Sequence, residues 1–460
     1  MQKDFWKQSI LTIFFAIAPI ILIGCGSGDS GDDDVSAGDD DSIPPDDDSN
    51  ADDDDLADDD LVDDDLVDDD TADDDSDDDD SIDDDAGDDD SADDDAVDDD
   101  SADDDAIDDD SADDDSGDDD SADDDSADDD SGDDDTVLEP YVYSIKVDNM
   151  PMADVISALS IFAEKNLTMI LNVRPPNLIG YDLAEVLAQA KKLGVPVKIW
   201  PLLNPADGSW GCEDDADLFI ANVLATMDYI AGADQNVKTI VLNMELGHPK
   251  IDLFEQYFAE GDWAAIVELL LGDRDLELFA QNMAKFQGLV DQLHQMGYFV
   301  QIGTYPFFLD DFPDGDPDIQ DICDVPIGDL TADLFSFAPY RTEFSDSFGF
   351  PLGAYLVYTY AKSARERYGS ASEIAVGIVP TQTEVGYDSP DQLAADIAAA
   401  KAAGVHRITV YHLPGILAQN DPDLWFGAFD TPPAQPEQEF IIDLMRSVVG
   451  LADFILNFIP

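Results

Sequence analysis

Two polar residues, Asn243 and Glu245, follow directly on the apolar run of residues 239–242. Side chains two positions apart in a strand lie on the same face, so the amide and the carboxyl group are expected to point to the same side. A carboxyl group that keeps its proton at neutral pH, because its surroundings are apolar or anionic, can act as a general acid. The alternative is that Glu245 only binds a polar ligand or caps the helix that follows.

Aromatic and polar residues also stand where other apolar runs end. They are Trp200, Trp210, Asn243, Tyr305, Tyr340, Arg341, Gln382, Tyr411 and His412. Aromatic rings can stack on sugar rings, while amide and charged groups can bind hydroxyl groups. This set is therefore typical of a site for a polyhydroxylated ligand. The same aromatic residues could instead belong to the core.

Eight short apolar runs alternate with stretches of helical period, which predicts a parallel sheet covered by helices. The predicted strands span residues 141–147, 167–173, 197–203, 237–244, 298–305, 334–338, 374–379 and 407–412. Helices are predicted over residues 153–165, 183–193, 217–230, 352–368, 391–403 and 439–458, with two or three more between 251 and 296. Eight strands can close into a (β/α)8 TIM barrel. The alternative is an open doubly wound sheet, but the sequence has no glycine-rich phosphate turn after the first strand.

In such a barrel, catalytic residues come from the C-terminal ends of the strands, where these candidates lie. Asn243-Met244-Glu245 resembles the end of the fourth strand in barrel glycoside hydrolases. The resemblance implies that Glu245 is the general acid and that Glu384, after the seventh strand, is the second carboxylate. Chitinase-type enzymes carry Asp-x-Glu here and the larger retaining clan carries Asn directly before the acid, so the sequence departs from both patterns. A non-catalytic carbohydrate-binding barrel is the alternative.

Several other classes of function lack their motifs in this sequence. No His-x-His pair follows the first strand, and no Walker loop, dinucleotide fingerprint or Gly-x-Ser-x-Gly elbow is present. We therefore expect no cofactor and no metal at the site.

The loop of residues 314–321 has only part of a calcium-loop pattern and is expected to be a solvated acidic loop. Residues 136–460 carry a net charge of −30, which argues against nucleic acid and anionic lipid as partners.

Residues 1–24 are predicted to be a lipoprotein signal peptide. Two lysines precede the apolar run of residues 10–23, as in secretory signals. The run ends in Leu22-Ile23-Gly24-Cys25, which resembles the lipobox of bacterial lipoproteins. The resemblance implies cleavage before Cys25, fatty acid on its thiol, and anchoring to the membrane. Gly26 after the cysteine implies an outer-membrane or cell-surface location, and an ordinary signal peptide is the alternative.

Residues 25–136 form an aspartate-rich segment after the predicted lipidation site. Between residues 29 and 135 there are 63 aspartates and no glutamate, lysine or arginine, within a chain of net charge −92. From residue 56 onward the unit is two mostly small residues and three aspartates, as in Ser91-Ala92-Asp93-Asp94-Asp95. Period five fits neither helix nor strand and the aspartates repel one another. The segment is therefore predicted to be a disordered tether that binds divalent cations loosely. A calcium-filled solenoid is the alternative.

Cys212 and Cys323 are the two cysteines of the predicted barrel domain, residues 137–460. Both fall in loops that a barrel would place on its active face. In an exported protein two such cysteines are more often bridged than free. The sequence therefore predicts a disulfide between them, with two free thiols as the alternative.

Overall fold

The computed structural model describes residues 139–175, 182–233, 237–272, 274–313, 315–381 and 385–457. Within these ranges eight parallel strands form a closed barrel, in which β1 pairs with β8. The strands are β1 Val142–Val147, β2 Thr168–Val173, β3 Val197–Pro201, β4 Thr239–Asn243, β5 Phe299–Thr304, β6 Leu334–Phe337, β7 Ser372–Gly377 and β8 Arg407–Tyr411. The predicted (β/α)8 barrel is confirmed. The predicted signal peptide, Cys25 and the aspartate-rich segment lie outside the described residues.

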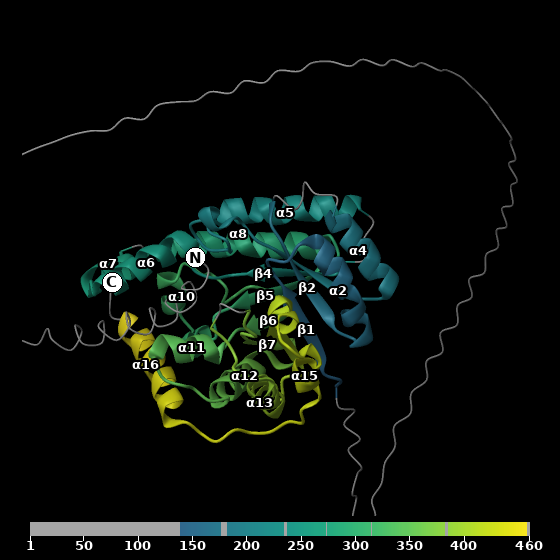
Figure 1. Cartoon of the computed structure of the whole chain (residues 1–460). Coiled ribbons are helices and arrows are strands. Elements are labelled where there is room, and N and C mark those ends of the chain that lie inside the picture. The colour runs from purple at the N-terminus through teal and green to yellow at the C-terminus, as the bar shows by residue number, and fades with distance from the viewer. Residues whose placement is uncertain are drawn as a thin grey trace, which may run out of the picture. The chain divides into compact units, whose positions relative to one another are not determined.

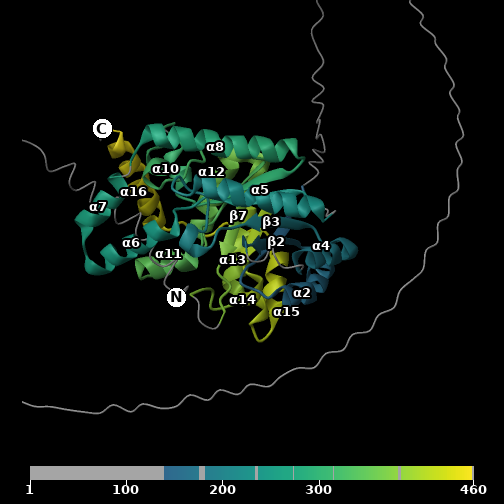
Figure 2. The same cartoon turned by 90° about the horizontal axis from the view of Figure 1, so that it is seen from above.

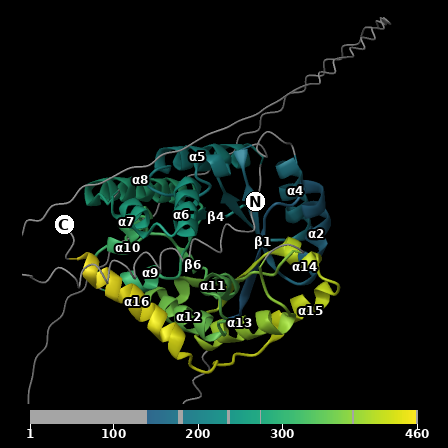
Figure 3. The same ribbon diagram turned by 60° about the vertical axis from the view of Figure 1, so that its left-hand side comes forward.

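The longer helices form a ring around the strands (Figures 1 and 3). They are α2 Met152–Glu164, α4 Asp182–Leu193, α5 Ala216–Gly232, α6 His248–Glu260, α7 Trp263–Leu271, α8 Leu276–Gln295, α12 Tyr355–Tyr368, α13 Pro390–Ala402 and α16 Phe440–Leu456. Shorter helices lie in the connections: α9 Phe308–Asp311, α10 Asp318–Ile322, α11 Arg341–Phe348, α14 Leu413–Leu417 and α15 Pro422–Gly427. The short helices were not predicted, because four to eight residues are too few to show a helical period.

The sequence pattern of the ring helices explains how they pack. In α2, Val155, Leu159 and Phe162 are buried at the spacing of one helical face. Each such side chain contributes about 1.5–3 kcal/mol when it leaves water. Both predicted glycine stops have positive φ, +71° at Gly194 and +83° at Gly404. Glycine is the residue that adopts this conformation without strain, so these helices end where predicted.

A polar network crosses the interior of the barrel. Lys198 Nζ lies 3.1 Å from Glu373 Oε2 and donates a hydrogen bond to Gln301 Oε1. Glu373 Oε1 also accepts hydrogen bonds from Ser336 and Thr409. Burial alone would raise the pKa of Glu373, but the charge of Lys198 and these hydrogen bonds bring it below its usual value. Glu373 is thus an ionised structural carboxylate.

The connection after β4 holds three helices, as predicted for residues 251–296. Phe254 of α6 packs with Ile266 and Leu270 of α7 in a small core of their own. These two helices lie side by side at the edge of the barrel domain (Figures 1 and 2). Among the described residues, no helix combines the length and the apolar character needed to cross a membrane.

Candidate active site

A cavity of about 550 Å³ lies at the C-terminal ends of the strands. Its lining residues are Lys146, Asp148, Asn149, Arg174, Trp200, Leu202, Pro205, Trp210, Asn243, His248, Asp252, Tyr340 and Tyr411. Barrel enzymes carry their active sites at this end. The lining includes five of the residues that the sequence predicted to bind a ligand: Trp200, Trp210, Asn243, Tyr340 and Tyr411.

Glu245 is joined to this cavity through Asn243. Asn243 Nδ2 donates a hydrogen bond of 2.5 Å to Glu245 Oε1. Glu245 is 3% exposed, and among the described residues its Oε2 atom has no hydrogen-bond partner. Burial raises the pKa of this carboxyl group to about 7, against the opposing effects of the Lys146 charge and the Asn243 hydrogen bond. Near neutral pH a large share of Glu245 therefore holds a proton that it can transfer.

A glycine on the neighbouring strand makes room for Asn243. Asn243 of β4 stands opposite Gly303 of β5. A Cβ atom at position 303 would lie 2.7 Å from Asn243 Oδ1, closer than carbon and oxygen can approach. Any side chain at this position would therefore displace Asn243 and its hydrogen bond to Glu245.

Lys146 is a residue of the site that the sequence analysis missed. Its Nζ atom lies 4.5 Å from the ring centroid of Trp200 and 5.9 Å from that of Tyr411. Burial lowers the pKa of the amine, and the opposing charges of nearby carboxylates, Glu245 first among them, do not offset this effect. The available signal was a lysine within a mostly apolar strand, on the same face as Asp148 two residues later.

Asp148 supplies a carboxylate on the cavity wall. It accepts hydrogen bonds from Asn172 Nδ2 and, at 3.3 Å, from the hydroxyl group of Tyr411. The guanidinium group of Arg174 also lines the cavity and donates to the carbonyl oxygen of Leu203. The site thus combines a hydrogen-bonded carboxylate, Asp148, with a carboxyl group in apolar surroundings, Glu245. Different environments of this kind give two carboxyl groups different roles.

Trp210 and His248, which both line the cavity, stack on each other. Their ring centroids are 4.9 Å apart and the planes differ by 16°. Burial, and then the charge of Arg174, lowers the pKa of His248 to about 4. The imidazole is therefore neutral at physiological pH.

Several of the predicted site residues that the structure describes do not line the cavity. Tyr305 is buried and stacks on Phe307 at 5.0 Å. His412 is buried beside Tyr411, with ring centroids 4.4 Å apart. Gln382 and Glu384 lie outside the described residues, so the predicted second carboxylate is not placed by the structure.

Arg341 also lies outside the cavity lining, where it makes structural contacts. Its Nε atom is 2.6 Å from Asp396 Oδ1, and its Nη1 atom donates to the carbonyl oxygen of Leu352. Asp396 is fully buried and also accepts a hydrogen bond of 2.6 Å from the hydroxyl group of Tyr387. This network takes up the guanidinium group that the sequence analysis expected to bind a ligand.

Cys212 and Cys323 are free thiols in the structure, so the predicted disulfide is not formed in it. Their loops do meet, because the Glu213 amide donates a hydrogen bond of 2.9 Å to the carbonyl oxygen of Asp324. Contact between loops does not by itself bring two sulfur atoms to bonding geometry. Cys212 Sγ instead donates to Asp215 Oδ2 at 3.4 Å. Burial raises the pKa of both thiols, which keeps them protonated.

The acidic loop before β6 is folded into the protein rather than solvated as expected. Asp318 and Asp321 are buried and pair with Arg274. Nearby, three residues each place one carboxylate oxygen within 4.8 Å of the others, a geometry that could hold a metal ion: Asp311, Asp316 and Asp453. None of the three lines the cavity.

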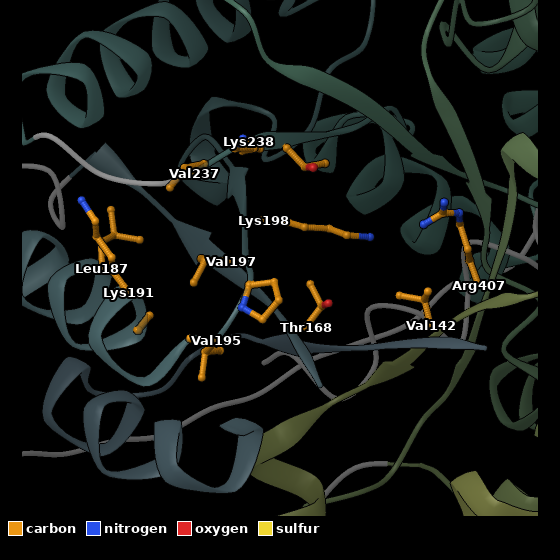
Figure 4. Close-up of a pocket in the computed structure, with 14 residues that line it drawn as sticks. Val142, Thr168, Leu187, Lys191, Val195, Val197, Lys198, Val237, Lys238 and Arg407 are labelled. Carbon is orange, nitrogen blue, oxygen red and sulfur yellow. The ribbon is translucent and has the colours of Figure 1, made fainter. Parts of the chain in front are cut away.

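A second cavity, of about 340 Å³, lies at the opposite end of the barrel. Basic residues line it, but their charged ends point in different directions (Figure 4). Lys198 is one of them, and its amine pairs with Glu373 in the barrel interior. The basic side chains do not converge on a common point, so we place the candidate active site at the C-terminal end.

This chain is similar to several solved structures, each at low sequence identity. No family model and no curated protein matches the sequence. Among solved structures, the PgaB (BpsB) glycoside hydrolase domain from Bordetella bronchiseptica is 11% identical, with a TM-score of 0.40 over 63% of this chain and 99% of that one. A GH5 family lichenase from Caldicellulosiruptor sp. F32 is 12% identical, with a TM-score of 0.40 over 60% and 82%. A D-allulose 3-epimerase from Methylomonas sp. is 12% identical, with a TM-score of 0.37 over 70% and 98%.

Proposed function

We propose that the barrel hydrolyses glycosidic bonds of an extracellular or cell-wall polysaccharide, with Glu245 as the general acid. The observation that carries this proposal is the buried carboxyl group of Glu245, with a pKa of about 7, held by Asn243 beside a cavity with aromatic walls. A glycosidic oxygen needs a proton as its bond to the sugar breaks. A carboxylic acid that is still protonated near neutral pH can supply it.

Glycoside hydrolysis needs a second carboxylate, which acts as nucleophile or base. Asp148 is the described carboxylate on the cavity wall that is held by side-chain hydrogen bonds, from Asn172 and Tyr411. Glu384 is the sequence-based alternative. A separation of about 5–5.5 Å between the two carboxyl groups gives a retaining enzyme, and about 6.5–9.5 Å gives an inverting one.

The test is hydrolysis of a panel of polysaccharides by the full chain and by Glu245→Gln. The amide keeps the shape and can still accept from Asn243, but it has no proton to transfer. Turnover should fall by about 10²–10⁴-fold with binding retained. Wild-type activity should also fall as the pH rises through about 7, because the acid loses its proton.

The matched control is Glu185→Gln, at an exposed position on α4, which should leave turnover unchanged. Asp148→Asn and Glu384→Gln, assayed in parallel, distinguish the two candidates for the second carboxylate. Hydrolysis that survives Glu245→Gln would refute the assignment of the acid.

One observation favours a carbohydrate-binding barrel without catalysis as the second candidate. Asn243 lines the cavity but Glu245 does not, so a ligand could contact the aromatic wall without reaching the acid. In that case a glycan binds without being cleaved, and Trp200→Ala or Trp210→Ala abolishes the binding measured by calorimetry.

The proposal also includes display at the cell surface, which rests on the sequence. Cys25 would carry the lipid, and the aspartate-rich segment would separate the barrel from the membrane. Cys25→Ser should leave the precursor uncleaved and unlabelled by a fatty-acid probe. Labelling that persists in this variant would exclude anchoring through Cys25.

A further inference from the structure

Lys146, which is partly exposed, differs from the buried lysines of the described part of the chain. Lys198 and Lys250 each pair with a carboxylate, at 3.1 Å and 2.5 Å. Lys401 donates to the carbonyl oxygens of Phe429 and Thr431. For Lys146 the structure gives no acceptor among the described residues, and its contacts are with aromatic rings.

An ammonium group has three N–H donors, and the Lys146 side chain is only partly exposed to the water that could accept from them. The amine of Lys146 lines the cavity over the ring of Trp200 and near that of Tyr411. The charged groups that act on it are four carboxylates, Glu245, Glu373, Asp148 and Glu343, and all of them favour the ammonium form. Burial outweighs them and lowers the pKa, which increases the share of neutral, nucleophilic amine at neutral pH.

We propose that Lys146 is a nucleophile that forms an imine with the carbonyl group of an aldehyde or ketone bound in the C-terminal cavity. The site so defined would take small hydroxyaldehydes and hydroxyketones, including the open-chain forms of sugars. This activity goes beyond the proposed glycoside hydrolysis and does not depend on it.

The neighbouring carboxyl group completes the chemistry. The amine nitrogen of Lys146 adds to the carbonyl carbon, and one amine proton passes to the former carbonyl oxygen, which gives a carbinolamine. The carboxyl group of Glu245 then protonates the carbinolamine hydroxyl group, the C–O bond breaks, and one water molecule leaves. The products are an iminium ion on Lys146 and a carboxylate on Glu245, so atoms and charge balance. Desolvation of a lysine amine is one of the ways in which proteins activate it for this reaction.

The test is reductive trapping. The full-length chain is incubated at pH 7 with glycolaldehyde, or with dihydroxyacetone, in the presence of sodium cyanoborohydride, which reduces an iminium ion to a stable secondary amine. Peptide mapping by mass spectrometry then gives the labelling rate of each lysine. Lys238 is the internal reference, because it is exposed and lies at the other end of the barrel.

Lys146 should be labelled faster than Lys238, because burial lowers the pKa of its amine and leaves a larger share of it neutral at pH 7. The excess should disappear in 8 M urea, where burial is lost. Lys146→Met should remove this fast-labelled site while Lys238 is labelled as before. Labelling of Lys146 at the rate of Lys238 or more slowly, in the folded protein, would overturn the proposal.

The outcomes also separate this inference from the proposed function. Fast labelling of Lys146 without cleavage of any glycan supports the imine site and counts against the hydrolase. Glycan cleavage that depends on Glu245, without preferential labelling of Lys146, supports the hydrolase and overturns the imine site.

Discussion

The buried carboxyl group of Glu245 should make the stability of the fold depend on pH. Its pKa is about 7 in the folded protein, against an ordinary value of 4.5. Below pH 4.5 the group is protonated in both the folded and the unfolded chain, so its favourable contribution to the free energy of unfolding is fully present. As the pH rises through 7 that contribution is lost, because the unfolded chain releases the proton more readily. One pKa unit corresponds to about 1.36 kcal/mol, so the loss amounts to about 3 kcal/mol.

Glu245→Gln removes this titration while it keeps an oxygen that accepts from Asn243 Nδ2. Urea unfolding of the full chain and of the variant, followed by circular dichroism at pH 4 and pH 9, measures the effect. Relative to wild type, the variant should gain about 3 kcal/mol of unfolding free energy between the two pH values.

Glu185→Gln is the control, because it makes the same chemical change at an exposed position. Its unfolding free energy should differ from that of wild type by no more than about 0.5 kcal/mol at either pH, as is usual for a surface substitution. A pH-independent difference for Glu245→Gln as well would refute the burial argument, and with it the basis for assigning the acid.

Three further predictions concern other buried groups. Asp396→Ala leaves Arg341 buried without its carboxylate, so chemical denaturation should show a loss of about 3–5 kcal/mol. The imidazole of His248 should titrate near pH 4 in an NMR titration, and a midpoint near the ordinary 6.5 would contradict its burial. Cys212 and Cys323 should both be alkylated when the chain is unfolded without reductant, whereas unreactive thiols that need reduction first would restore the disulfide hypothesis.

The barrel was predictable from the sequence because its signals are local. Each strand is a short apolar run, each ring helix shows a repeating buried face, and Gly194 and Gly404 end their helices at positive φ. The pairing of Asn243 with Glu245 followed from the period of two in a strand, and their hydrogen bond agrees with it. Patterns of this kind depend only on neighbours along the chain, so one sequence is enough to recognise them.

The details of the candidate site depend on contacts between distant parts of the chain. Asp148 meets Tyr411 only because β1 pairs with β8 and closes the barrel. The sequence analysis predicted that Arg341 binds a ligand, but the fold pairs its guanidinium group with Asp396. In the sequence, Lys146 is one lysine within a predicted strand, and nothing marks it as a site residue. Burial lowers its pKa, and the side chains that bury it come from other strands. The sequence determined the elements, the face of β4 that carries chemistry and the end of the barrel where it lies. The tertiary structure decided which charges are paired, which are buried without a partner, and therefore which groups can react.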